Sequence, residues 1–99
     1  MVVGTLVVDL LLGDVHSLKE KRAVVRPIVA ELRRRFDVAA AETGATDLHR
    51  RSEVGVAVVS STHRHAVDVL EQCERLVAGR PEVELLSARH RVLDDDDLN

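Results

Sequence analysis

Residues 53–77, EVGVAVVSSTHRHAVDVLEQCERLV, decide how the rest of the chain is interpreted. Within residues 53–60, Val54, Val56 and Val58 alternate with Gly55 and Ala57, which is the two-residue period of a β-strand. The hydroxyl side chains at 60–62 then favour a helix N-cap, and the apolar residues change to a helical period. Those apolar positions are Ala66, Val69, Leu70, Cys73, Leu76 and Val77. The stretch predicts a strand followed by an amphipathic helix, which Gly79 and Pro81 would end.

The same order of strand and helix is expected at the start of the chain. Val2 to Leu12 is apolar on both parities except at Thr5 and Asp9, which is typical of a central strand. Ser17-Leu18-Lys19-Glu20 has the pattern of a capping box, so a helix is predicted to begin there. Its residues at helical spacing are Leu18, Arg22, Val25, Val29, Leu32 and Phe36. Pro27 lies inside this helix and is expected to kink it.

The remaining segments complete an α+β pattern. Residues 36–43 predict a short strand, 44–52 a mobile connection, and 82–93 a last strand. The order β-α-β-β-α-β predicts a ferredoxin-like sandwich, in which a four-stranded antiparallel sheet carries both helices on one face. We expect residues 1–93 to form this domain and residues 94–99 to form an acidic disordered tail.

Composition limits the type of core and the setting of the protein. Phe36 is the only aromatic residue, so aliphatic side chains must build the core and no platform exists for stacking unpaired bases. Cys73 is the only cysteine, which excludes an internal disulfide and favours a reducing cytoplasm. The chain starts directly on a predicted strand, so we expect a cytoplasmic protein that does not associate with membranes.

Charge is distributed unevenly along the chain. The formal net charge is −3, but four of the acids are Asp94 to Asp97. Residues 16–35 contain seven lysines or arginines and two glutamates, a local charge of +5. Such a patch suits the phosphates of RNA, although basic helix faces are often only solvated. The candidate RNA-binding residues are Lys19, Lys21, Arg22, Arg26, Arg50 and Arg51. Arg22 is ambiguous because it falls on the apolar row, where it would pair with Asp9 or Glu42.

No catalytic or cofactor-binding motif is found. The sequence contains neither a P-loop nor a dinucleotide-binding glycine motif, and Ser60 and Ser61 lack a nucleophile elbow. His63 and His65 would diverge by about 200° on a helix, which disfavours a shared metal ion. Cys73 lies on the apolar row, where burial would blunt a thiol. These features predict a non-catalytic binding protein that needs no cofactor, no metal and no small-molecule substrate.

A second function is predicted by the sheet face that the helices leave open. Apolar side chains of the first and third strands would otherwise contact water there, and a patch of that size usually marks a partner. The candidate residues for this partner or dimer face are Val3, Val7, Leu11, Ala57 and Val59. The alternative to an RNA-binding module is therefore a homodimer or protein-interaction module without direct RNA contact.

Several segments together resemble the YlxP-like family, a bacterial domain family of unknown function. They are Val2-Val3-Gly4, SLKEKR at 17–22, FDVAAAE at 36–42, VGVAVVS at 54–60 and PEVELL at 81–86. The resemblance spans residues 1–93 and implies a ferredoxin-like fold. It also implies a gene often located among transcription and translation genes, near that of ribosome-binding factor A. Ribosomal RNA or a ribosome-associated protein is the partner that this implies. The chain departs from the family pattern at Pro27, at His63-Arg64-His65 and in the acidic tail.

Overall fold

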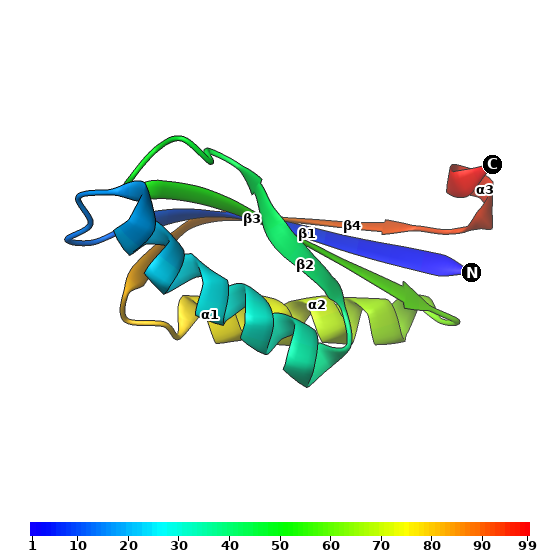
Figure 1. Ribbon diagram of the computed structural model, residues 1–99. Coiled ribbons are helices and arrows are strands. Elements are labelled where there is room, and N and C mark those ends of the chain that lie inside the picture. Colours follow the sequence, from blue (N-terminus) through cyan, green and yellow to red (C-terminus); the bar gives the residue numbers. More distant parts are fainter.

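The chain forms a four-stranded antiparallel sheet that carries two long helices (Figure 1). The computed structural model describes residues 1–99. Its elements are β1 (Val2–Leu12), α1 (Leu18–Phe36), β2 (Ala39–Gly44), β3 (Arg51–Ser60), α2 (His63–Ala78), β4 (Val83–Leu93) and α3 (Asp95–Leu98). The strands lie in the order β2-β3-β1-β4, with α1 and α2 on one face of the sheet and the other face uncovered. The predicted α+β class and the antiparallel sheet are confirmed.

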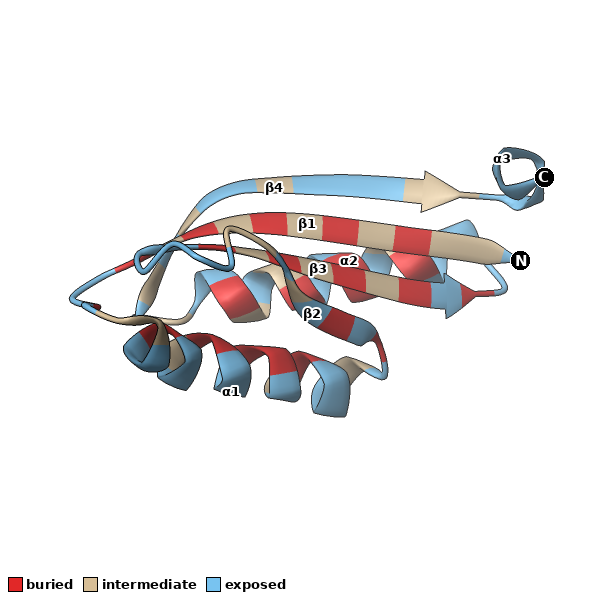
Figure 2. Ribbon diagram, turned by 45° about the horizontal axis from the view of Figure 1, so that its top comes forward, coloured by how far each residue is buried: buried red, intermediate tan, exposed pale blue.

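The core lies between the sheet and the two helices. Every second residue of β1 and β3 is buried, which gives the alternating pattern in Figure 2. α2 contributes most of the residues that its helical period predicts, among them Leu70 and Cys73, each 0% exposed, whereas Leu76 is only partly buried. Gly4 on β1 lets α2 pack closely, because a Cβ atom there would lie 3.0 Å from Leu70 Cδ1 and 3.1 Å from Val58 Cγ1.

The N-terminus of α1 is capped as its sequence predicts. The Ser17 hydroxyl accepts a hydrogen bond from the Glu20 amide (3.1 Å), and Glu20 Oε2 accepts one from the His16 amide (2.6 Å). The carboxylate thus reaches the residue before the cap, and together the two bonds satisfy amides that the helix leaves free. The helix continues through the exposed Pro27 without interruption.

The C-terminus of α1 differs from the expectation. The segment 36–43 was expected to be a strand, but Phe36 is the last residue of the helix and β2 begins only at Ala39. Asp37 ends the helix in the left-handed conformation (φ 51°, ψ 51°), which aspartate tolerates better than most residues. This reversal turns the chain back so that β2 runs beside α1.

The acidic C-terminus, expected to be a disordered tail, includes the one-turn helix α3. Asp94 caps it, since its carboxylate accepts hydrogen bonds from the amides of Asp96 and Asp97. The Asp95 carboxylate lies 3.0 Å from the amino group of Met1, which joins the two ends of the chain. The three acids in the first turn are favourably placed because the helix dipole is positive there.

Replacement of a core side chain of α2 tests this packing. Leu70→Ala should lower the free energy of unfolding by about 2–5 kcal/mol, because it removes a fully buried side chain and leaves a cavity. Gln72→Ala, on the exposed face of the same helix, should change it by less than about 0.5 kcal/mol. Urea unfolding measures both, and a loss below that value for Leu70→Ala would contradict the assigned helix face.

Candidate functional site

Lys21 of α1 is buried, with 1% of its surface exposed. Its Nζ lies 2.8 Å from Glu42 Oε2 on β2 and donates hydrogen bonds to the carbonyl oxygens of Ala45 (2.5 Å) and Leu48 (2.8 Å). The same Glu42 oxygen accepts a hydrogen bond from Ser52 Oγ on β3 (2.7 Å). All three donors of the ammonium group therefore have an acceptor, which is what a buried lysine requires.

The burial of Lys21 corrects two predictions. Lys21 was assigned to an exposed RNA-binding surface, and Arg22 to the apolar row of the helix. The buried residues that form the row are Lys21, Val25, Ile28, Val29 and Leu32. Lys21 thus extends the row by one turn toward the N-terminus, whereas Arg22 is exposed. Glu42 forms an internal ion pair with Lys21, not with Arg22 as predicted.

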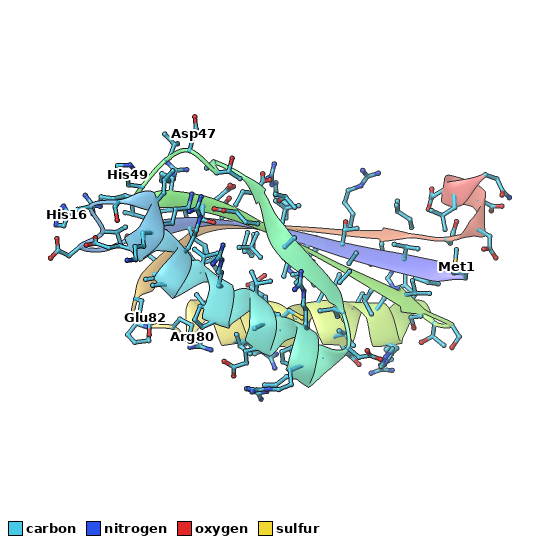
Figure 3. All side chains as sticks on the ribbon, viewed as in Figure 1. Met1, His16, Asp47, His49, Arg80 and Glu82 are labelled. Atoms are coloured by element: carbon cyan, nitrogen blue, oxygen red, sulfur yellow. The ribbon has the colours of Figure 1, made fainter.

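The connection between β2 and β3, which Lys21 joins to α1, is also joined to the end of β1 by Arg50. Its Nε donates hydrogen bonds to the carbonyl oxygens of Leu12 (3.1 Å), at the end of β1, and Gly13 (2.9 Å), just after it. This connection lies at one end of the molecule, where Figure 3 shows His16, Asp47 and His49 close together. The hydrogen bonds of the Arg50 side chain thus go to backbone carbonyl groups next to β1, not to α1.

Arg51 is also separated from the basic surface of α1. It begins β3 and pairs in register with Leu11 of β1, whose side chain belongs to the uncovered face of the sheet. α1 covers the opposite face. The prediction that Arg51 extends the surface of α1 is therefore wrong, and Arg50 is engaged with backbone carbonyl groups at the end of β1.

Four cations of α1 do form one continuous exposed row. They are Lys19, Arg22, Arg26 and Arg33, and we call them the cationic row. Intervals of three, four and seven residues return to nearly the same side of a helix, so the four side chains share one face. None of them forms an ion pair. The acids of α1 lie elsewhere, because Glu20 belongs to the cap and Glu31 pairs with Arg35 and Arg80.

The cationic row borders a hollow between α1 and β2. This hollow of about 490 Å³ is lined by three arginines of the row together with Val25, Val29, Ala30, Ala41 and Glu42. Arg33 Nε also donates a hydrogen bond to the Ala40 carbonyl oxygen (2.8 Å), at the outer edge of β2. Arg33 was not predicted as a site residue from the sequence, because a cation near a helix C-terminus is already favoured by the helix dipole. Its spacing of seven residues from Arg26 was the available signal.

The uncovered sheet face contains an ionic network that the sequence did not reveal. Arg89 of β4 lies 3.8 Å from Asp9 Oδ2 and 3.4 Å from Glu53 Oε1. Ser87 Oγ donates a hydrogen bond to the same Asp9 oxygen (2.6 Å), and Thr43 Oγ1 donates one to Glu53 (2.7 Å). Side chains from all four strands thus form a polar band across this face.

The polar band divides the apolar patch predicted on the same face. Val3, Val7, Ala57 and Val59 lie on one side of it, whereas Leu11 lies beyond the pair Asp9–Glu53. Val59 is 66% exposed, and the other four are half-buried. Next to this patch, small side chains line a shallow hollow of about 540 Å³, where Thr43 packs over Gly55. The predicted face therefore exists, but it is smaller and less uniform than expected.

The chemistry available at these surfaces is mainly binding of anions. None of the four guanidinium or ammonium groups of the cationic row forms an ion pair, and Glu42, which lines the hollow beside them, is paired with Lys21. Burial raises the pKa of the Cys73 thiol to about 11, so it remains protonated and a weak nucleophile at neutral pH. No group of three or more His, Cys, Asp or Glu side chains is placed to hold a metal ion.

None of the helices combines the length and the apolar character that a membrane crossing requires.

Comparison with known proteins gives two matches. The family model described as "Protein of unknown function (DUF503)" matches residues 3–90. The chain is also similar to the "Uncharacterized protein YlxP" of Bacillus subtilis (strain 168). The two are 33% identical over 76 residues, which cover 77% of this chain and 83% of the relative.

Removal of the buried ammonium group tests its structural role. Lys21→Met should lower the free energy of unfolding by about 3–5 kcal/mol, because the Glu42 carboxylate then loses its cation in a largely buried site. Lys19→Met, on the exposed side of the helix, should change it by less than about 0.5 kcal/mol. The double variant Lys21→Met/Glu42→Gln should lose less than the sum of its two single variants. Thermal unfolding that gives equal values for Lys21→Met and Lys19→Met would contradict this role.

Proposed function

The chain belongs to the DUF503 family of proteins of unknown function, and we propose that it is a non-catalytic protein that binds RNA through the cationic row of α1. The observation that carries this proposal is the absence of ion pairs along Lys19, Arg22, Arg26 and Arg33. Five of the ten other lysines and arginines are neutralised by ion pairs within the domain, as at Lys21–Glu42 and around Arg89. An exposed row of unpaired cations is expected to attract a polyanion.

The form of RNA that suits the row is a double helix. The fourteen residue-to-residue steps from Lys19 to Arg33 span about 21 Å of helix axis, enough to follow several successive phosphates. Sequence-specific recognition of single strands usually needs aromatic side chains that stack on bases. Phe36 is the only aromatic residue and is half-buried beside Arg35. Contacts of the row would therefore reach the backbone and groove shape of RNA, with little readout of bases.

Two finer assignments belong to the same proposal. The order β-α-β-β-α-β and the strand order β2-β3-β1-β4 support a ferredoxin-like classification of the fold. The gene neighbourhood implied by the family resemblance makes ribosomal RNA in the cytoplasm the first RNA to test, with a role in translation or ribosome biogenesis.

A second candidate function rests on the open sheet face. Val59 exposes 66% of its surface beside Val3 and near the small-residue hollow around Ala57. A partner protein that covers these side chains would remove apolar surface from water. In this alternative, α1 would make no RNA contact and its cations would be a solvated helix face.

A charge reversal of the row discriminates between the two functions. Lys19→Glu/Arg22→Glu/Arg26→Glu should weaken binding to a short RNA duplex and reduce the slope of log K against log salt by about 3, since each phosphate contact contributes about 0.9. Folding should be retained because these side chains are exposed. Lys21 is left unchanged because it is buried, and Arg33 because it binds the edge of β2.

The matched control reverses the same number of charges away from the row. Arg35→Glu/Arg64→Glu/Arg75→Glu changes three exposed arginines and should lower the salt slope much less. Fluorescence anisotropy with a labelled duplex and with a single strand of equal length measures both variants. Equal losses in the two triple variants would indicate a non-specific charge effect, and unchanged binding in the row variant would favour the open-face function.

A further inference from the structure

The two edges of the sheet are protected to different degrees. β2 forms one edge with only six residues, its register with β3 is irregular between Glu42 and Gly44, and Arg33 occupies the outward carbonyl of Ala40. Short strands, irregularities and covering side chains are the usual means by which an edge avoids pairing with another chain. The β2 edge is thus unsuited to further strand addition.

The edge formed by β4 lacks the short length and the covering side chain that protect β2, and its one irregularity is the register shift with β1 between Asp9 and Leu10. β4 is eleven residues long, contains no proline, and lies outermost in the sheet with no element beside its free edge (Figure 2). No side chain forms a hydrogen bond with its backbone. Apolar side chains are also left half-buried there, as at Val83, Leu85 and Val92, and Leu86 is 43% exposed. Such an edge is a template for another strand.

We propose that β4 pairs with the β4 of a second copy of this chain, antiparallel about a two-fold axis at Ala88, so that two sheets join into one of eight strands. This interface is independent of the cationic row and of the apolar patch on the open sheet face. It is isologous, as most dimer interfaces are, because each copy presents the same edge.

The register follows from an irregularity in β4. Arg89 and Arg91 lie on the open face, opposite Val7 and Thr5 of β1. The register shifts between Asp9 and Leu10, so that Glu84, opposite Leu11, shares the open face with Arg91 although the two residues differ in parity. A bulge adds one residue to a strand, and both copies contain it. Pairing Ala88 with Ala88 of the partner subunit then places Arg91 opposite Glu84 of the partner subunit, twice per dimer.

Charge complementarity selects a second copy as the occupant and Ala88 as the centre. Glu84 and Arg91 are both exposed, and neither forms an ion pair within its own chain. A two-fold axis at Arg89 would place two arginines directly opposite each other, and an axis at His90 would do so twice. Like charges in opposed positions destabilise a sheet, whereas opposite charges stabilise it. With the axis at Ala88, two small alanine side chains face each other at the centre. Arg89 then lies opposite Ser87 of the partner subunit, and Arg91 lies opposite Glu84 of the partner subunit.

The apolar side chains of the same edge agree with this register. Val83 and Val92 both lie on the helix side of the sheet, opposite Leu12 and Gly4. With the axis at Ala88, each Val92 would face Val83 of the partner subunit. Pairs of β-branched residues are among the favourable cross-strand pairs. Backbone hydrogen bonds and these valines would provide the affinity, and the two ion pairs would fix the register.

The test uses two single variants, each of which should associate weakly with itself, whereas a mixture of the two should associate. Glu84→Arg places arginine opposite arginine at both contacts, and Arg91→Glu places glutamate opposite glutamate. Each should weaken self-association by at least about fivefold relative to the natural chain, measured by sedimentation equilibrium of the full chain at low salt. In an equimolar mixture every contact again joins an arginine and a glutamate, so the mixed dimer should form with nearly the natural affinity. Circular dichroism confirms that both variants fold, which is expected since both sites are exposed.

Val59→Asp is the matched control, because it introduces a charge on the open face of β3 rather than at the β4 edge. It should leave the association constant unchanged. A natural chain that stays monomeric at the highest accessible concentration would overturn the proposal. So would single variants that associate as strongly as the natural chain, a mixture that shows no recovery, or a dimer abolished by Val59→Asp.

Discussion

A single buried ammonium group determines how α1 lies on the sheet. Lys21 Nζ joins the helix to Glu42 of β2 and to two carbonyl groups of the connection that follows β2, and Ser52 of β3 binds the same carboxylate. Burial of a charge is costly unless every donor finds an acceptor, so few arrangements of these segments are acceptable. The rotation of α1 about its own axis is thereby fixed. With Lys21 turned inward, Arg22 must point outward, and the cationic row follows from that orientation.

The three sides of α1 are each used differently. Its inner side completes the core, and one flank carries the unpaired cations along the β2 edge. The other flank carries Glu31, which pairs with Arg35 and with Arg80 just beyond α2. The sheet shows a similar division, since β2 is covered at its edge while β4 is open. The proposed RNA surface and the proposed dimer edge therefore lie at opposite sides of the domain, and one can be occupied without obstructing the other.

Local patterns were sufficient for most of the elements and insufficient for the site. The strand 53–60 and the apolar row of α2 follow strict periods, so their buried residues could be predicted one by one. Lys21 could not, because a lysine in an apolar row is normally taken for a surface residue, and its partners are up to 27 positions away. The contact between Ser87 and Asp9, 78 positions apart, depends on the register of β4 against β1, which no local pattern encodes. Asp94 is a favourable N-cap residue, so α3 could have been predicted, but the run of four aspartates favoured a disordered tail instead.

The single cysteine, Cys73, can report on opening motions of the domain. Cys73 is inaccessible beneath α2 and is held protonated by burial. A disulfide reagent can therefore reach it only when α2 detaches from the sheet or the whole domain opens. Labelling rates then measure the frequency of those openings in the unmodified chain, without any introduced probe. The domain contains neither tryptophan nor tyrosine and so lacks the usual intrinsic fluorophores. The Cys73 sulfur atom is therefore the natural place to observe motion of the core.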